Sequence, residues 1–153
     1  MNKLKNTFTP QKVKSINYDA IFYTGGGAAM FGVPENIEIQ KKAYKIYANN
    51  GIVASVCHGT AGILLINDDS GMPIIRGKRI NGYPDLFENK QNDYYKSFPF
   101  SIEKKAKEQG GIFEYSNKRN SKFYIIDGKI ITGQDTSSSA LVAIEVVKFI
   151  SSN

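Results

Sequence analysis

Short continuous runs of apolar residues mark the strands expected in this chain. Residues 19–27 (DAIFYTGGG) and 52–57 (IVASVC) are two such runs, and glycines end the first of them. Because apolar residues fill both alternating positions, we expect these strands to be buried on both faces of a sheet. Residues 122–133 (KFYIIDGKIITG) place Asp127-Gly128 between two further apolar runs, which predicts a two-residue hairpin.

Helical periodicity fills the stretches between and after these runs. A first helix follows Pro34, with Asn36 as its predicted N-cap and Gly51 as its left-handed stop. Its apolar positions recur at i, i+4, i+7 and i+8 and are Ile39, Ala43, Ile46 and Tyr47. Residues 59–66 (GTAGILLI) have helical propensity and lead into a turn, DDSG, at 68–71. One face of a final helix, at about 138–151, carries Val142, Val146, Phe149 and Ile150.

The order strand, helix, strand, helix, hairpin, helix predicts an α/β fold. Alternation of this kind is typical of a sandwich in which helices cover both faces of a mainly parallel sheet. A length of 153 residues fits one domain, residues 1–153, and is sufficient for a buried core.

Composition indicates the cellular compartment of this domain. No apolar stretch reaches the roughly 20 residues needed to cross a bilayer, so no membrane contact is expected. The opening segment MNKLKNTFTPQKVKS is polar and lacks the apolar centre of a secretory signal, and a single cysteine cannot form an internal disulfide. We therefore expect a cytoplasmic protein.

The positive charge of the chain does not indicate a nucleic-acid partner. The formal net charge is +6, but the lysines are scattered among Asn, Glu and Gln, as in IEKKAKEQGG at 102–111. A nucleic-acid interface would instead show a basic stripe interleaved with aromatic residues.

The only cysteine and the only histidine of the chain, Cys57 and His58, are adjacent where the second strand meets a helical segment. A buried strand that turns abruptly into a helix holds the residue at the turn in a strained conformation, exposed at the carboxyl end of the sheet. Gly59, Ala61 and Gly62 keep this turn free of bulky side chains, and the amino terminus of the helix should favour the Cys57 thiolate. The alternative is a buried structural cysteine. The histidine and the small residues favour a reactive thiol.

Five ordered motifs carry a resemblance to a known family. VCHGTAG (56–62) resembles the VCHGPAG elbow of the ThiJ/PfpI superfamily, the class I glutamine amidotransferase-like fold, in its glyoxalase III and chaperone branch. The other four are TGGGAAMFGVPEN, GKRINGYPDLFEN, SFPFSIEKKAKEQGG and IDGKIITGQDTSSSA, which resemble GGHGAMWDxPDN, GKxVTGFxxxxE, PFxLExxLxxxGA and VDGxLITGQNPxSS. The match runs from about residue 5 to 148 and implies a flavodoxin-like three-layer sandwich.

The resemblance assigns roles to three residues. The elbow cysteine of the family is its nucleophile, which implies that role for Cys57, and His58 takes the position of the base. Glu88, six residues after Gly82, matches the acidic third member that orients the histidine, and Asp85 is the alternative. A thiolate that adds to an aldehyde, an imidazole that moves a proton between adjacent carbons and an orienting carboxylate form a complete site. Neither a metal nor an organic cofactor is expected.

The glycine run at 25–27 is a candidate oxyanion site. The backbone N–H groups of Gly25, Gly26 and Gly27, together with that of His58, are placed to bind a developing negative charge. The alternative is a plain turn after the strand, where glycines are common. A dinucleotide-binding GxGxxG motif starting at Gly25 is disfavoured, because it requires glycine where Met30 stands.

Departures from the family pattern are largest at the start of the chain. Family members have a strand, a helix and further strand structure upstream of the segment LKNT, so the resemblance implies an N-terminally truncated domain. The absent region includes a central strand and the glutamate that hydrogen-bonds the cysteine in most members. We therefore expect an unpaired edge along AIFYTG (20–25). A second copy or a complementary N-terminal chain is favoured to cover it over FTPQKVKSI (8–16) folding back.

Two classes of function follow from the resemblance. The first is a cofactor-independent glyoxalase III-like lyase that converts a small aldehyde, methylglyoxal, into lactate, or a related deglycase. The second is a non-enzymatic stress protein, either a holdase or an inactive partner of a complementary chain. An amidotransferase is disfavoured, because its triad histidine lies far downstream of the cysteine, whereas His58 follows Cys57 directly.

Overall fold

A mainly parallel four-stranded sheet forms the centre of the protein. The computed structural model describes residues 7–152. The first six residues of the polar opening segment, which include most of LKNT, lie outside it. The strands, in their order across the sheet, are β1 (Ala20–Tyr23), β2 (Ile52–Val56), β6 (Ile130–Gly133) and β5 (Tyr124–Asp127). The β1–β2 and β2–β6 pairs are parallel, and the β5–β6 pair is antiparallel. The predicted α/β class is confirmed.

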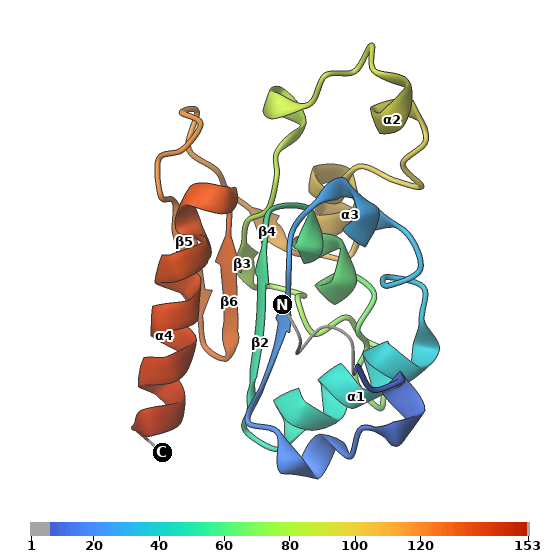
Figure 1. Ribbon diagram of the computed structural model, residues 1–153, viewed down its shortest axis with the longest axis vertical. Coiled ribbons are helices and arrows are strands. Elements are labelled where there is room, and N and C mark those ends of the chain that lie inside the picture. Colours follow the sequence, from blue (N-terminus) through green and yellow to red (C-terminus); the bar gives the residue numbers. More distant parts are fainter. Residues whose placement is uncertain (1–6, 153) are drawn as a thin grey trace.

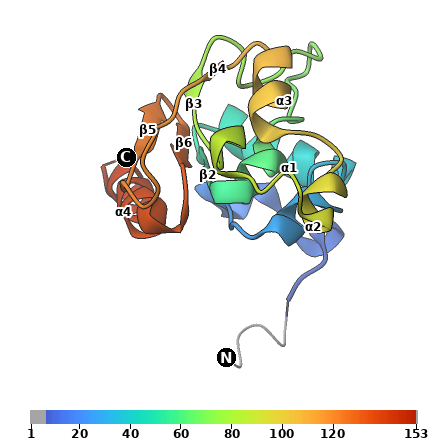
Figure 2. The same ribbon diagram turned by 90° about the horizontal axis from the view of Figure 1, so that it is seen from above.

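Helices cover both faces of this sheet, which makes the predicted three layers (Figures 1 and 2). α1 (Ile37–Ala48) lies on one face, where its Ala43 joins a core that includes Val53 of β2, and its Ile46 is also buried. α4 (Ser139–Ser151) lies on the other face, where Val142 and Val146 pack against the alternate β2 residues. The remaining elements are β3 (Arg79–Ile80), α2 (Asp93–Lys96), α3 (Ile102–Glu108) and β4 (Ile112–Phe113).

The residue that caps the start of α1 is the predicted one, but the left-handed residue that follows its end is not. Asn36 caps the helix, and its side chain accepts a hydrogen bond from the Ile39 N–H at 3.1 Å. The left-handed residue after the helix is Asn50 (φ 67°), so the prediction of Gly51 at that position is wrong. Gly51 is needed for close packing instead, because a Cβ there would lie 2.7 Å from the Asp19 carbonyl oxygen.

The predicted hairpin is present, with its turn shifted by one residue. Asp127 pairs with Ile130, so the two turn residues are Gly128 (φ 62°) and Lys129. Asp127 stays in the strand because its carboxylate accepts hydrogen bonds from the Lys78 ammonium at 3.0 Å and from a backbone N–H of β3 at 2.9 Å. A contact distant in sequence therefore sets the register of the turn.

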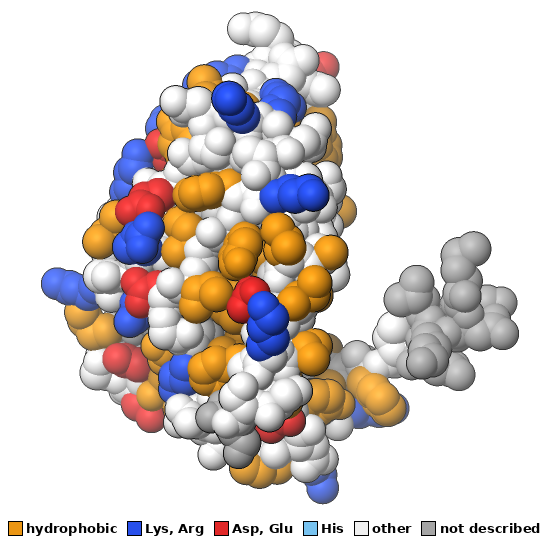
Figure 3. All heavy atoms as spheres, turned by 90° about the vertical axis from the view of Figure 1, so that its left-hand side faces the viewer, with side chains coloured by type: hydrophobic (Ala, Val, Ile, Leu, Met, Phe, Trp, Pro, Cys, Tyr) orange, Lys and Arg blue, Asp and Glu red, His pale blue; other side chains and the backbone are white. Residues whose placement is uncertain are grey.

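The outer face of α4 is more apolar than expected. Ile150, predicted on the buried face, is 38% exposed near the end of the helix, and Ile144 and Val147 are also exposed. Figure 3 faces this side of the molecule and shows apolar side chains lying among charged ones. α4 is nevertheless not a membrane span, and within residues 7–152 no helix is both long and apolar enough for that.

Candidate active site

The backbone turns sharply at Cys57, directly after the fully buried strand β2. Cys57 has a φ of 58°, a left-handed conformation that non-glycine residues rarely adopt, which confirms the predicted strained turn. The segment that follows, Cys57–Ile63, is a 3₁₀ helix and not the longer helix predicted over 59–66. Its glycines allow close packing against the end of β1, because a Cβ on Gly59 would lie 2.4 Å from the Tyr23 carbonyl oxygen.

The thiol of Cys57 is covered, which corrects the expectation of an exposed thiolate. The residue is only 7% exposed, and burial raises the pKa of the Cys57 thiol above its ordinary value. The backbone N–H groups of His58 and Gly26 lower that pKa, but burial is the larger effect. The resting site therefore holds a thiol, which needs a base to become a nucleophile.

Alkylation of the only cysteine measures this pKa. Because the pKa of Cys57 is raised, a smaller fraction is thiolate at neutral pH than in a free cysteine, and we expect slower reaction with iodoacetamide. The rate should rise as the pH passes through the raised pKa and level off at a higher pH than for free cysteine. The chain unfolded in urea is the control. Reaction faster than that of free cysteine at pH 7 would contradict the prediction.

The base and its orienting group lie beside the thiol. The Cys57 Sγ atom is 3.4 Å from His58 Nδ1, and His58 Nε2 is 2.8 Å from Glu88 Oε1. Both side chains of the His58–Glu88 pair are about nine-tenths buried. Because Glu88 accepts a hydrogen bond from Nε2–H, the proton of the neutral ring stays on Nε2 and Nδ1 is free to accept the proton of the thiol. Glu88 thus meets His58 as expected, and the catalytic roles of the three residues stay predictions.

Asp85, the alternative partner, is engaged elsewhere. Its carboxylate accepts a hydrogen bond at 2.7 Å from the hydroxyl of Ser101, the N-cap residue of α3. Asp85 begins the single 3₁₀ turn Asp85–Phe87 and Glu88 directly follows it, so their side chains meet different neighbours. The structure therefore places Glu88, and not Asp85, at the imidazole.

The three glycines at 25–27 lie against the site in different ways. Gly26 (φ 100°) directs its N–H toward the Cys57 sulfur. A Cβ on Gly25 would lie 2.9 Å from the Cβ of Cys57, and one on Gly27 would overlap the hydroxyl of Tyr94. Binding of an oxyanion by these N–H groups stays a prediction, and Gly26 is the best placed of the three.

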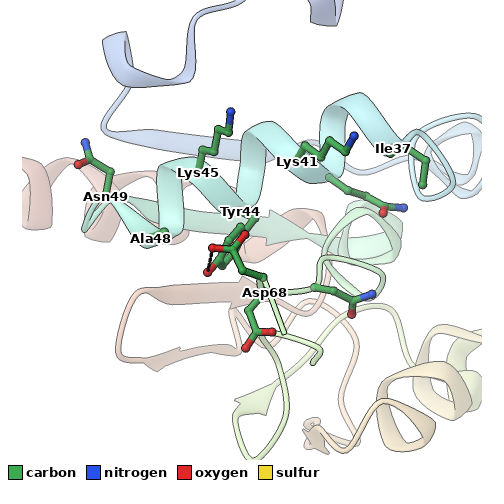
Figure 4. Close-up of a pocket in the computed structure, with 10 residues that line it drawn as sticks. Ile37, Lys41, Tyr44, Lys45, Ala48, Asn49 and Asp68 are labelled. Carbon is green, nitrogen blue, oxygen red and sulfur yellow. Dashed lines mark hydrogen bonds between the residues drawn. The ribbon is translucent and has the colours of Figure 1, made fainter. Parts of the chain in front are cut away.

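The two larger of three hollows found over residues 7–152 do not include Cys57, His58 or Glu88 in their lining. One, of about 670 Å³, runs along α1 and is lined by polar side chains such as Lys41, Lys45 and Asp68 (Figure 4). The other, of about 680 Å³, lies beside β1 and is lined mostly by apolar residues. Within residues 7–152, no group of three His, Cys, Asp or Glu side chains is placed to hold a metal ion.

Comparison with known proteins identifies the family of this chain. Residues 2–148 match the DJ-1/PfpI family. The chain belongs to that family. It is 29% identical over 143 residues to the probable glutathione-independent glyoxalase hsp3104 of Schizosaccharomyces pombe, covering 92% of this chain and 64% of that protein. It is 31% identical over 143 residues to the glutathione-independent glyoxalase HSP31 of Saccharomyces cerevisiae, covering 91% and 60%.

Solved structures place the chain in the same DJ-1/PfpI fold. It superposes on Rapid Encystment Protein 24 KDa of Francisella tularensis with a TM-score of 0.88 at 32% identity, covering 97% of this chain and 65% of that one. For glyoxalase III of Candida albicans the TM-score is 0.84 at 29% identity, covering 92% and 60%. The chain thus spans 60–65% of the length of these four proteins.

Sequence reasoning missed two aromatic residues that hold the imidazole of this DJ-1/PfpI site. The ring of Tyr83 stacks on His58 with centroids 4.7 Å apart, and Phe98 meets the same imidazole edge-on at 5.3 Å. Tyr83 lies within the motif that contains Glu88, so its position beside an expected catalytic residue was the available signal. Phe98 lies within the motif SFPFSIEKKAKEQGG, but nothing there links it to His58, because the contact joins residues forty positions apart.

Proposed function

We propose that this DJ-1/PfpI chain is a cofactor-independent glyoxalase III-like lyase that converts methylglyoxal into lactate, or a deglycase acting through the same thiol. The observation that carries the proposal is the hydrogen-bonded chain in which the Cys57 thiol meets His58 and His58 meets Glu88. The names of the relatives from Schizosaccharomyces pombe and Saccharomyces cerevisiae support the choice of a small aldehyde as substrate.

The proposed reaction begins with addition of the thiol to the aldehyde. The Cys57 proton passes to His58 Nδ1 while a bond forms between Sγ and the aldehyde carbon, and the carbonyl oxygen becomes an oxyanion. The Gly26 and His58 N–H groups are the candidates to stabilise this charge until the oxyanion takes the proton from His58, which leaves the imidazole neutral. The product of this step is a hemithioacetal with the neighbouring ketone intact.

The second stage moves a hydrogen between adjacent carbons. His58, neutral again, removes the proton from the carbon bonded to sulfur while the ketone oxygen gains a proton, which gives an enediol. The hydroxyl on the sulfur-bound carbon then loses its proton as His58 returns a proton to the second carbon. This leaves a thioester of lactate, which water cleaves to lactate and the free Cys57 thiol. The reaction adds one water to methylglyoxal and needs no net redox reagent. Glu88 keeps the His58 ring in the tautomer that accepts at Nδ1.

The test is conversion of methylglyoxal to lactate by the chain in the absence of glutathione. Lactate measured enzymatically, with formation proportional to chain concentration, supports the lyase. A parallel assay of amine release from a methylglyoxal-treated amino acid distinguishes the deglycase. If neither product forms, the lyase and the deglycase are both excluded.

The second candidate is a non-enzymatic role as the partner of another polypeptide. Two observations favour it: the outer edge of β1 lies at the end of the main sheet, and the outer face of α4 exposes apolar side chains. Unpaired strand edges are ready sites for pairing with another chain. This role is compatible with a lyase that completes its sheet by association.

We further propose that the β1 edge is paired by a second copy of this chain. Because the Asp19 carbonyl accepts from the Ile52 N–H, the backbone groups of Ala20 and Phe22 point away from β2. The N-terminal segment does not fill this edge, since Pro10–Lys12 and Ser15–Asn17 form 3₁₀ turns against α1. The apolar hollow beside β1 adds surface that a paired strand would cover.

Sedimentation at micromolar concentration should therefore detect a dimer. We expect the Ala20→Pro variant to be monomeric, because its missing N–H points outward while the β1–β2 hydrogen bonds remain. Ala20→Ser, which keeps the N–H, is the matched control and should dimerise like the wild-type chain. A monomeric wild-type chain, or a dimer unaffected by the proline, would contradict pairing through this edge. A monomer that binds a separately supplied N-terminal segment would indicate a complementary chain instead.

A further inference from the structure

Arg119 connects the two parts of the structure that hold His58 and Glu88. Its Nη1 atom donates a hydrogen bond to the Tyr83 hydroxyl at 2.7 Å, and its Nη2 atom donates to the carbonyl of Phe87. Tyr83 is the residue whose ring stacks on His58, and Phe87 directly precedes Glu88. The guanidinium carbon also lies 4.8 Å from the centre of the Phe87 ring. One side chain thus contacts the support of the imidazole and the support of the carboxylate.

The loop that carries Arg119 is itself fastened to the central sheet. Gln134 directly follows β6 and is fully buried, and its side chain accepts from the Ser116 N–H at 2.7 Å and donates to the Ser116 carbonyl. Asp135, 4% exposed, accepts from the Asn120 N–H at 2.9 Å. Hydrogen bonds from these two buried side chains hold the backbone on both sides of Arg119.

Phe87, directly before Glu88, is only 6% exposed, and its carbonyl also accepts a hydrogen bond from the Tyr83 hydroxyl at 3.5 Å. Beyond these contacts, the backbone of Glu88 has few constraints. Its N–H reaches the Asp85 carbonyl at 3.4 Å, at the end of a single 3₁₀ turn, and the residues that follow, Asn89 and Lys90, are exposed. A hydrogen bond from a guanidinium to a carbonyl is stronger than one between neutral groups. The contact of Arg119 with Phe87 therefore adds a charge-assisted restraint on where the Glu88 carboxylate lies.

We propose that Arg119 is a positioning residue for the lyase reaction, which sets the plane of the His58 ring through Tyr83 and the reach of Glu88 through the Phe87 carbonyl. The inference rests on the proposed function for its kinetic consequence, but its structural part concerns only the His58–Glu88 pair. Arg119 acts through these neighbours and not on the substrate. Removing it should change how His58 is held while the fold of the sheet is preserved.

The Arg119→Met variant tests the proposal, because methionine keeps much of the side-chain length and loses every donor. We expect kcat to fall by about 10- to 100-fold with a smaller change in KM, since a small displacement of a reacting group has effects of this size. Arg119→Lys, which keeps the charge and one donor at a time, should recover part of the loss. Lys118→Met, a loss of charge at the adjacent exposed position, is the matched control and should leave kcat unchanged.

Nuclear magnetic resonance supplies a readout independent of turnover. His58 is the only histidine, so the ¹⁵N signals of its ring need no assignment by mutation. In the wild-type chain they should report one tautomer, with the proton on Nε2, and in Arg119→Met they should report a mixture. Tyr83→Phe, which keeps the stacked ring and loses only the hydroxyl, should give an intermediate spectrum and an intermediate kcat.

The outcomes separate this inference from the proposed function. If the wild-type chain makes no lactate but Arg119→Met changes the His58 tautomer, the lyase is excluded and the positioning of His58 is supported. If the chain is active and Arg119→Met leaves both kcat and the ring signals unchanged, the positioning role is overturned. A variant that lowers kcat together with thermal stability, with unchanged His58 signals at low temperature, also overturns it.

Discussion

The Cys57→Ser variant should lose nearly all conversion of methylglyoxal to lactate, with kcat lower by about a thousandfold or more. The substitution exchanges only the side-chain sulfur for oxygen and makes no new demand on the left-handed backbone at this position. The fold should therefore be preserved. A serine hydroxyl is far less acidic than a thiol, and the imidazole of His58 cannot convert it into a comparable nucleophile. Lactate formation at saturating methylglyoxal, measured for both chains at equal concentration, checks the prediction.

Two controls make the Cys57→Ser result interpretable. Thermal unfolding should give similar midpoints for the two chains, because the serine is nearly isosteric with the cysteine that it replaces. Wild-type chain alkylated at Cys57 should be as inactive as the variant, since this is the only cysteine. Turnover by the folded variant within about tenfold of wild type, a difference of only 1.4 kcal/mol in activation free energy, would exclude the thiol as nucleophile.

Glu88→Gln should have the second largest effect, lowering kcat by about 10²- to 10⁴-fold while KM changes less. The amide preserves the shape of the side chain and the reach to His58 Nε2, at 2.8 Å in the wild-type chain. It removes the negative charge that holds the proton on Nε2 and stabilises the imidazolium formed when His58 takes the thiol proton. Steady-state kinetics with methylglyoxal measures the loss, and Glu88→Asp should recover part of it.

Asp85→Asn is the matched control for Glu88→Gln. It removes a carboxylate three residues earlier in the same segment, where the partner is the Ser101 hydroxyl at the start of α3. We expect kcat close to that of the wild-type chain and a small loss of thermal stability. If Asp85→Asn is the more damaging variant, Glu88 is not the orienting group and the static hydrogen bond to His58 has no catalytic meaning.

Part of the site was predictable because the signals were local in sequence. The apolar run of β2, the small residues after it and the adjacent Cys57 and His58 indicated a strained turn, and Cys57 has the left-handed φ that such a turn requires. Glu88 was assigned from a motif at a distance of 30 residues, and the 2.8 Å contact with His58 agrees with that assignment. The prediction of an exposed Cys57 thiolate was wrong, because burial raises the pKa of this thiol and depends on which other segments cover it.

The sequence by itself determined the α/β class, the parallel strands, the N-cap of α1 and the hairpin, because hydrophobic periodicity and turn residues act within a few positions of each other. Only the tertiary structure decided which side chains surround the imidazole. Tyr83, Phe98 and Arg119 come from three separate segments and meet at His58 or its support through packing. Such contacts depend on the path of whole loops. The buried Gln134 and Asp135 hold the loop of Arg119 from the carboxyl end of β6, and no local sequence pattern encodes that path.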